Sequence, residues 1–324
     1  MKTLCRVALA ALCLSFFGHV PALAAEVEYP TRPIRIVVGF TPGGGNDIIA
    51  RVFGQKLSES LGQPVIIENK PGAGAMLATE YVARSAPDGY TLLVGASGAM
   101  TISPAVYEKI NYDTMRDFKP VSSLGSFPLI LIVNAKSEFK SLADLVTYAK
   151  ANPDKANYSS SSAAFQLATE LFKQKTGAPM QMIPYKGAND SVTAVISGEV
   201  TATIADAGPV ISQVNGGLAR ALAVAAPTRA ESLPNVPTMK EAGADVEAVL
   251  WSGIFVPAAT PPEIARKLEA EFVRIARLPD VVARLKLLNI DSVGNSSEEF
   301  SRIIAADLER WRAVARAGNI KIAQ

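Results

Sequence analysis

The sequence has almost no cysteine or histidine, and the few that it has lie near the N-terminus. Two of the 324 residues are cysteine (Cys5 and Cys13) and one is histidine (His19). The chain after residue 24 therefore cannot form disulfides, thiol nucleophiles, zinc sites with thiolate or imidazole ligands, or histidine-dependent catalytic triads. We expect this chain to hold neither a metal ion nor a cofactor.

Long hydrophobic runs are also missing. The longest apolar stretch near the N-terminus covers residues 7–17, follows Lys2 and Arg6, and is followed by the small-residue pattern ALA at residues 22–24. These features are typical of a secretory signal peptide spanning residues 1–24, with Ala25 as the first mature residue. No later run approaches the ~20 apolar residues that span a bilayer, so we expect a soluble, exported protein.

The chain lacks an excess of either charge. Hydrophobic residues make up 49% of the sequence and charged residues 19%, which is typical of a globular protein. Removal of Lys2 and Arg6 with the signal peptide leaves 30 basic against 30 acidic side chains, a net charge of zero. Because no basic block remains either, we expect no nucleic-acid partner.

Short apolar runs alternate with helix-like stretches through most of the chain. This alternation predicts an α/β fold with parallel sheets covered on both faces, and the length suggests about two domains. The chain ends in two amphipathic helices, each opened by a capping-box pattern. The expected strands are 34–38, 65–67, 91–94, 129–133, 181–183, 201–204, 221–225 and 254–256. The expected helices include 47–61, 142–151, 165–176, 191–197, 264–278 and 300–317.

A glycine-rich segment, GFTPGGGND at residues 39–47, follows the first expected strand. Glycines let backbone N–H groups approach a ligand, and a helix N-terminus adds unpaired donors, so this segment is suited to bind an anion without a charged side chain. It is equally compatible with a tight turn before a helix capped by Asn46 or Asp47. Glycine-rich or serine-rich loops also follow other strands at residues 69–74, 95–98 and 159–162, and such loops converge at one edge of an α/β sheet. Their recurrence favours a binding cleft.

Two aspartates and two serines could instead indicate an enzyme. Asp47 and Asp206 could act as an acid–base pair or bind a hard cation, or they could simply cap a helix and fix a loop. Residues 95–99 (GASGA) resemble a nucleophile elbow around Ser97, but the final glycine and a histidine are missing. Ser137 begins a Ser-x-x-Lys pattern whose Ser-Asp-Asn companion is absent. A serine hydrolase is therefore a remote alternative.

Residues 39–47 resemble the Gly-(aromatic)-x-x-Gly-Gly-x-x-Asp signature of the Bug receptors, the extracytoplasmic solute-binding proteins of tripartite tricarboxylate transporters. The resemblance covers essentially the whole mature chain. Further matching segments, in family order, are 68–74 (ENKPGAG), 86–93 (APDGYTLL), 184–187 (PYKG), 220–224 (RALAV) and 233–238 (LPNVPT).

The resemblance implies a two-domain periplasmic-binding-protein (Venus-flytrap) fold. Residues 26–126 and 251–324 would form domain 1, including the C-terminal helices, and residues 127–250 would form domain 2. The protein would be a non-enzymatic, monomeric periplasmic receptor that captures a small organic carboxylate between the domains and delivers it to the membrane subunits of a tripartite transporter. A receptor that presents its ligand to a membrane sensor kinase is the alternative.

The resemblance also implies which residues hold the ligand, largely through backbone amides and ordered waters. The first jaw, on domain 1, would consist of Phe40, Thr41, Pro42, Gly44, Asn46 and Asp47, with Ser97 as an additional candidate. The second jaw, on domain 2, would consist of Ser160, Ser161, Ser162 and Phe165, with Gly187, Ala188 and Asp206 as the floor. We expect a side chain at Gly44 to enter the place of the anion.

The second jaw departs from the family pattern. Residues 158–167 read YSSSSAAFQL, without the usual glycines and Ser-His pair, and Asp206 is followed by Ala-Gly where Asn-Leu is usual. The ligand of relatives therefore does not transfer directly, and the apolar residues suggest an aromatic or branched carboxylate.

Overall fold

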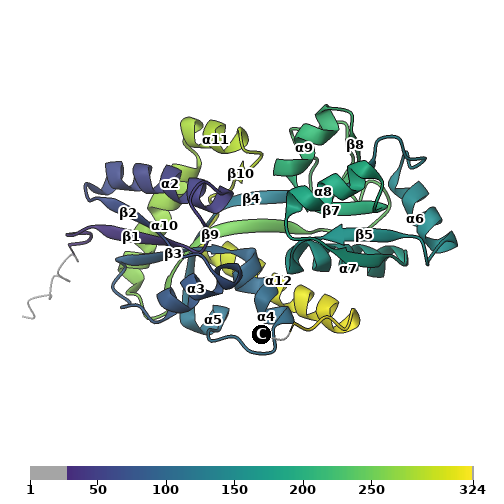
Figure 1. The fold of residues 1–324 in the computed structure, drawn as a ribbon. Helices are drawn as coiled ribbons and strands as arrows, with labels where there is room; N and C mark the ends of the chain where they lie inside the picture. The colour runs from purple at the N-terminus through teal and green to yellow at the C-terminus, as the bar shows by residue number, and fades with distance from the viewer. Residues whose placement is uncertain (1–27, 323–324) are drawn as a thin grey trace, which may run out of the picture.

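The computed structural model describes residues 28–322, which form two halves joined by two long strands (Figure 1). The signal peptide expected at residues 1–24 lies outside the described residues. One sheet has the strand order β2-β1-β3-β9-β4, and β4 continues into a second sheet with the order β4-β7-β5-β6. Helices flank both sheets, as the α/β prediction requires.

The first half is built from the N-terminal elements and most of the C-terminal ones. The strands are β1 (Ile34–Val38), β2 (Val65–Asn69), β3 (Thr91–Ala96) and β10 (Asp291–Ser292). The helices are α2 (Gly45–Leu61), η1 (Ala73–Ala75), α3 (Met76–Ala83), η2 (Gly98–Ile102), α4 (Ser103–Val106), α5 (Thr114–Asp117), α10 (Pro262–Ala276) and α11 (Pro279–Lys286).

The second half contains the middle of the chain. Its strands are β5 (Asn157–Ser160), β6 (Gln181–Pro184), β7 (Ala202–Asp206) and β8 (Ala219–Val224). Its helices are α6 (Leu142–Ala151), α7 (Ala163–Thr176), α8 (Ala188–Ser197) and α9 (Ala207–Asn215). The parallel order β7-β5-β6 brings the ends of β5 and β7 together, while β6 lies at the outer edge of the sheet.

Two strands, β4 (Phe118–Asn134) and β9 (Val249–Pro257), carry the chain between the halves. The first part of β4 pairs with the whole length of β9, and its last residues pair with β7 and β8. The expected domain boundaries, 126/127 and 250/251, fall within these two strands and stay a prediction.

The expectation of purely parallel sheets is wrong for these connecting strands. β9 is antiparallel to β3 and β4, and β4 is antiparallel to β7 and β8. The antiparallel arrangement arises because β4 leaves the first half and β9 returns to it, so the two strands run in opposite directions. The strand expected at residues 129–133 is the last part of the longer β4, which begins at Phe118. Buried serines and Gly125 interrupt the apolar pattern before Leu129.

Each half has its own hydrophobic core, and the last helix packs on both. The C-terminal helix α12 (Ser297–Ala317) buries Phe300 and Ile304 in the first half. Its later residues Trp311 and Val314 lie in the core of the second half. We expected the C-terminal helices to pack on domain 1. In the structure α10 packs in the core of the first half, whereas α12 spans the junction between the halves (Figure 1).

Candidate functional site

A cleft of about 570 Å³ lies between the two halves. Its walls come from the segments that follow β1, β3, β5 and β7, and from β9, which crosses between the halves. The lining residues include no lysine, arginine, histidine or glutamate, and their single aspartate is Asp206. They are Phe40, Gly43, Gly45, Asn46, Ile48, Gly74, Ala96, Ser97, Gly98, Ile102, Ser103, Tyr107, Phe127, Ser162, Ala163, Ala164, Asp206, Ala207, Gly208, Leu250, Trp251, Ser252, Leu288, Asn289 and Ile290.

The first jaw begins where the buried strand β1 ends. Gly39 is required there because a Cβ would lie 2.3 Å from the Cβ of Ala75. The loop then turns through Gly43, whose φ of +88° favours glycine, and α2 begins at Gly45. The first N–H groups of an α-helix have no partner within the helix, so the start of α2 offers hydrogen-bond donors beside the cleft.

Asp47, in the first turn of α2, fixes this loop through hydrogen bonds. Its side chain is only 2% exposed and accepts hydrogen bonds from the N–H of Gly43, from Nδ2 of Asn69 and from Nε of Arg51, each 2.9 Å long. Asn69 also donates to the carbonyl of Phe40 over 3.0 Å. Burial disfavours the charged carboxylate, but these three donors outweigh it and lower the pKa of Asp47. Asp47 does not line the cleft and fixes the shape of the first jaw.

Ser97 lies at the end of β3 and supports β9. Its hydroxyl is 2% exposed and accepts a hydrogen bond of 3.2 Å from the N–H of Trp251. The hydroxyl of the neighbouring Ser252 donates to the side-chain oxygen of Asn46, which ties β9 to the start of α2. No histidine is present in residues 28–322 to activate Ser97, so the geometry gives it a structural role at the cleft wall.

The second jaw follows β5 directly. Ser162 is the N-cap of α7, and its hydroxyl accepts the N–H of Phe165 over 3.4 Å. The buried Ser160 donates to the carbonyl of Ser162 over 3.1 Å, which uses its hydroxyl within the loop. Ser162 and the first two residues of α7 are the part of this jaw that lines the cleft.

Asp206 ends β7 and occupies the N-cap position of α9, yet its side chain makes no capping hydrogen bond. One carboxylate oxygen, Oδ1, is buried and has no hydrogen-bond partner among the described residues. Burial raises the pKa of Asp206, and only the N–H of the same residue opposes this shift. The residue neither caps its helix nor fixes a loop.

The structure brings five of the predicted site residues to the cleft wall: Phe40, Asn46, Ser97, Ser162 and Asp206. The other predicted residues lie beside the cleft or away from it. Thr41, Pro42 and Gly44 are exposed on the first loop, and Ser160, Ser161 and Phe165 belong to the second jaw without lining the cleft. Gly187 is the N-cap and Ala188 the first residue of α8, which follows the outermost strand β6, and neither residue is part of the cleft lining.

Sequence reasoning missed the aromatic and C-terminal part of the lining. Trp251, which is not among the predicted site residues, lines the cleft, and its indole N–H donates to Oδ2 of Asp307 on α12 over 2.8 Å. The segment 288–290 also reaches the cleft, from between α11 and β10. Its sequence carries no signal for this position, whereas Gly74 and Gly98 lie in loops that were already singled out.

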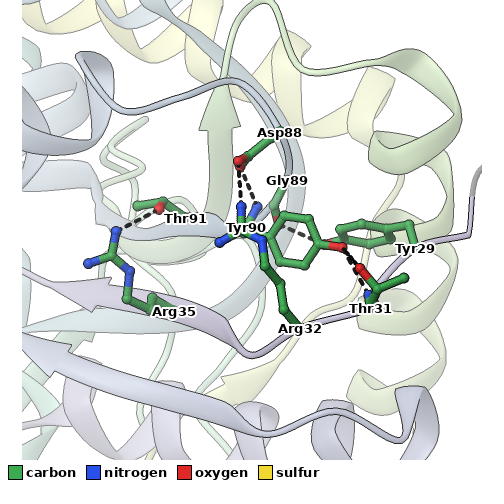
Figure 2. A network of polar contacts seen from close by, with 8 residues as sticks. All are labelled: Tyr29, Thr31, Arg32, Arg35, Asp88, Gly89, Tyr90 and Thr91. Carbon is green, nitrogen blue, oxygen red and sulfur yellow. Dashed lines mark hydrogen bonds and ion pairs between the residues drawn. The ribbon is translucent and has the colours of Figure 1, made fainter.

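One segment shared with the Bug family is structural. Residues 86–93 comprise the turn before β3 and the first three residues of that strand, at the opposite end of β3 from Ser97. Figure 2 shows how this turn holds the start of the described chain: the hydroxyl of Tyr29 donates to the carbonyl of Gly89 over 2.6 Å, and Arg32 pairs with Asp88 at 2.7 Å. The guanidinium of Arg32 also lies 3.9 Å from the ring centroid of Tyr90.

Residues 28–322 contain neither a metal-binding cluster nor a helix that could span a membrane. No three histidine, cysteine, aspartate or glutamate side chains are grouped closely enough there to hold a metal ion. No helix in this part of the chain combines the length and apolar character needed to cross a membrane.

The arrangement can bind an anion through backbone donors. Three helices of nine residues or more, α2, α7 and α9, each begin with residues that line the cleft. Each helix N-terminus presents unpaired N–H groups and the positive end of a helix dipole. Phe40, Phe127 and Trp251 add apolar surface. The cleft is therefore suited to a small molecule with an anionic group and an apolar body.

Known proteins resemble this chain in both sequence and architecture. A family model described as "Tripartite tricarboxylate transporter family receptor" matches residues 49–320. Protein BugT of Bordetella pertussis is 35% identical over 95% of this chain and 97% of its own length. A protein of R. palustris solved with adipate is 32% identical, with a TM-score of 0.77, over 92% of this chain and 100% of its own. MatC of Rhodopseudomonas palustris, solved with malate, is 29% identical, with a TM-score of 0.73, over 88% of this chain and 99% of its own. The chain belongs to the receptor family of the tripartite tricarboxylate transporters, which includes the Bug proteins.

Proposed function

We propose that this chain is a non-enzymatic periplasmic receptor that captures a small organic carboxylate between two domains, residues 26–126 with 251–324 and residues 127–250. It would act as a monomer and deliver the carboxylate to the membrane subunits of a tripartite tricarboxylate-type transporter. The observation that carries the proposal is the cleft between the two halves, which the N-termini of α2, α7 and α9 border and whose lining among residues 28–322 contains no basic side chain. The relatives solved with adipate and malate support a carboxylate as the ligand.

Backbone donors are strong enough for this task. A hydrogen bond to a charged group contributes ~1.5–3 kcal/mol, and a helix dipole adds roughly 0.3–1 kcal/mol. Micromolar affinity corresponds to about −8 kcal/mol. Four or five amide or hydroxyl contacts reach this value after part of their energy is lost to desolvation and closure of the cleft. The first jaw would supply the amides at the start of α2, and the second jaw those at the start of α7.

A ligand that touches both jaws would also favour a closed form. Because β4 and β9 connect the halves, a change in their mutual orientation would occur along these strands. The closed form would be the one that the membrane subunits recognise.

A thermal-shift and calorimetry screen of carboxylates tests the proposal on the mature protein. A ligand at 100 times its dissociation constant stabilises the protein by ~2.7 kcal/mol. We expect at least one carboxylate to raise the melting temperature and to bind saturably without being converted. The matching amide or alcohol of each hit is the control, since it lacks the negative charge and should bind far more weakly.

Two results would contradict the proposal. If no carboxylate in a panel of aliphatic, branched and aromatic acids stabilised the protein, the ligand class would be wrong. If a crystal structure of a complex placed the carboxylate on lysine or arginine side chains outside the cleft, the proposed site would be wrong. Transport itself is tested by uptake of the labelled ligand in cells that lack either this receptor or the membrane subunits.

A further inference from the structure

Asp206 is an unusual residue for a cleft that binds an anion. It is the one aspartate in the lining, which contains no glutamate, lysine, arginine or histidine. Its Oδ1 is buried without a partner among residues 28–322, and its position at the start of α9 gives it no capping hydrogen bond. When ionised, this carboxylate places a negative charge on the wall of the second half, and its Oδ1 has no side-chain or backbone donor among these residues.

The residues that follow Asp206 in the cleft lining supply no side-chain donor to its carboxylate. Ala207 and Gly208, which follow it and also line the cleft, have no polar side chain. A Cβ at residue 208 would lie 3.9 Å from Oδ2, in van der Waals contact, and Gly208 leaves this space beside the oxygen unfilled. Burial without a compensating donor is costly for a carboxylate, and a ligand that supplies a donor would remove this cost on binding.

The charge of Asp206 also restricts what the ligand can carry. A second carboxylate placed beside Asp206 would be repelled, because no basic side chain of the described lining separates the two charges. A hydroxyl or an ammonium group would be attracted, and hydrogen bonds to a charged acceptor are the stronger ones.

We propose that the ligand is a hydroxy- or amino-carboxylate whose hydroxyl or ammonium group donates a hydrogen bond to the Asp206 carboxylate, while its own carboxylate is bound by the backbone amides of the cleft. The inference rests on the proposed function, because it refines the ligand class of the same cleft. Asp206 acts here as a specificity-determining residue that prefers a donor over a second anionic group.

The test compares ligands that share a carbon skeleton and differ only in the donor. Suitable sets are propanoate, lactate and alanine; butanoate, 3-hydroxybutanoate and 3-aminobutanoate; and succinate, malate and aspartate, with adipate as a longer donor-free diacid. Dissociation constants are measured by calorimetry at pH 7.5 with the mature wild-type protein. In at least one set, the donor-bearing member should bind at least about tenfold more tightly than the donor-free member.

Two substitutions separate the hydroxyl from the ammonium group. Asp206→Asn retains an acceptor oxygen but removes the charge, so it should abolish a preference for the ammonium ligand and leave part of a preference for the hydroxyl ligand. Asp206→Ala should abolish both preferences, and donor-free diacids should bind this variant more tightly than they bind the wild type. Asp190→Asn is the matched control, since it removes the same charge at the start of α8, outside the cleft lining.

Each outcome decides the question. If carboxylates bind but the donor-bearing members have no advantage, or keep the same advantage in Asp206→Ala, the inference fails and the proposed function stands. If a donor-free diacid binds best, and binds still better as the pH is lowered, Asp206 supplies a proton itself and the inference also fails. If no carboxylate binds at all, the proposed function fails and the inference falls with it.

Discussion

Asp47 and Asp206 both stand near the start of a helix beside the cleft, one in each half, and their surroundings differ completely. Asp47 accepts three hydrogen bonds from Gly43, Asn69 and Arg51, whereas Oδ1 of Asp206 has no partner among the described residues. The pKa of Asp47 is lowered because its donors outweigh its burial, and the pKa of Asp206 is raised by burial. The aspartate side chain is therefore hydrogen-bonded within the fold in the first half, whereas in the second half one of its oxygens has no partner among the described residues.

This difference separates two tasks of a binding cleft. The first jaw is held by the hydrogen bonds of Asp47 and Asn69 before a ligand arrives, which should reduce the ordering cost of binding. The wall around Asp206 keeps an unsatisfied group, which the fold tolerates at a cost in stability and which a ligand can satisfy. We infer that the backbone amides of the jaws provide affinity for the carboxylate, while Asp206 in the second half selects the rest of the ligand.

The largest effect is expected from a side chain placed in the first jaw. A Cβ at Gly45 would lie 3.1 Å from Cε1 of Phe127 and 3.6 Å from Cδ1 of Ile290, so Gly45→Val would fill the cleft between α2 and these residues. We expect the affinity for the carboxylate to fall by roughly 100-fold or more. Calorimetry measures the loss, and circular dichroism checks that the fold is intact.

Gly44→Val is the matched substitution one residue earlier. A Cβ at Gly44 meets no atom closer than the carbonyl oxygen of Thr41 at 3.8 Å, and Gly44 does not line the cleft. The two variants decide which glycine faces the anion. If Gly44→Val abolished binding and Gly45→Val did not, the anion would lie on the exposed side of the loop, where sequence analysis placed it.

The second prediction removes the support of the first jaw. Asp47→Ala leaves the N–H of Gly43 and the side chain of Asn69 without their acceptor, and we expect the free energy of unfolding to fall by about 2–3 kcal/mol. Affinity should fall as well, although Asp47 does not line the cleft. Chemical denaturation and calorimetry measure the two effects, and Asp47→Asn, which retains one acceptor oxygen, should lose less of both.

The pH dependence of this loss has a fixed sign. The pKa of Asp47 is lower in the folded state, so its carboxylate stabilises the fold above the unfolded-state pKa of about 3.9, and this stabilisation is lost as the pH falls through the folded-state pKa. The stability difference between wild type and Asp47→Ala should therefore be full at pH 7 and shrink below pH 4. A difference that grew on acidification would show that the hydrogen bonds to Asp47 are absent.

Sequence alone predicted the fold class and the general place of the cleft, for reasons visible in particular residues. β1 is a continuous apolar run, and the glycines at 43–45 allow the turn into α2, so both follow from local composition. The family resemblance supplied the two-domain arrangement. The length of β4 could not be predicted from local sequence. Ser122 and Gly125 interrupt its apolar pattern, and only tertiary packing buries them.

The site was predictable as a set of loops and less so as a set of contacts. Whether a side chain in a loop faces the cleft depends on partners far along the chain, such as Asn69 for Asp47 and Trp251 for Ser97. Position along the sheet matters too: Gly187 follows the outermost strand β6, and no local pattern encodes that order. Trp251 is a buried core residue that also lines the cleft, and this second role depends on tertiary structure.

The smallest effect is expected from Asp206→Asn in the absence of ligand, and its direction is opposite to that of the Asp47 variants. Because the pKa of Asp206 is raised in the folded state, the folded protein binds more protons than the unfolded chain between about pH 3.9 and the folded-state pKa. The free energy of unfolding therefore falls as the pH rises through this window. Above the folded-state pKa, the charged carboxylate destabilises the fold by its full amount. The asparagine carries no such penalty.

At pH 8 we expect Asp206→Asn to raise the melting temperature by about one or two degrees, and at pH 3.5 the two proteins should melt together. Differential scanning calorimetry of both proteins at these two pH values measures the comparison, with Asp190→Asn as the charge-matched control. A variant less stable than the wild type at pH 8 would mean that the Asp206 carboxylate already has a stabilising partner in the free protein. In that case the two aspartates would be equally committed to the fold, and the second half would have no unsatisfied group with which to select a ligand.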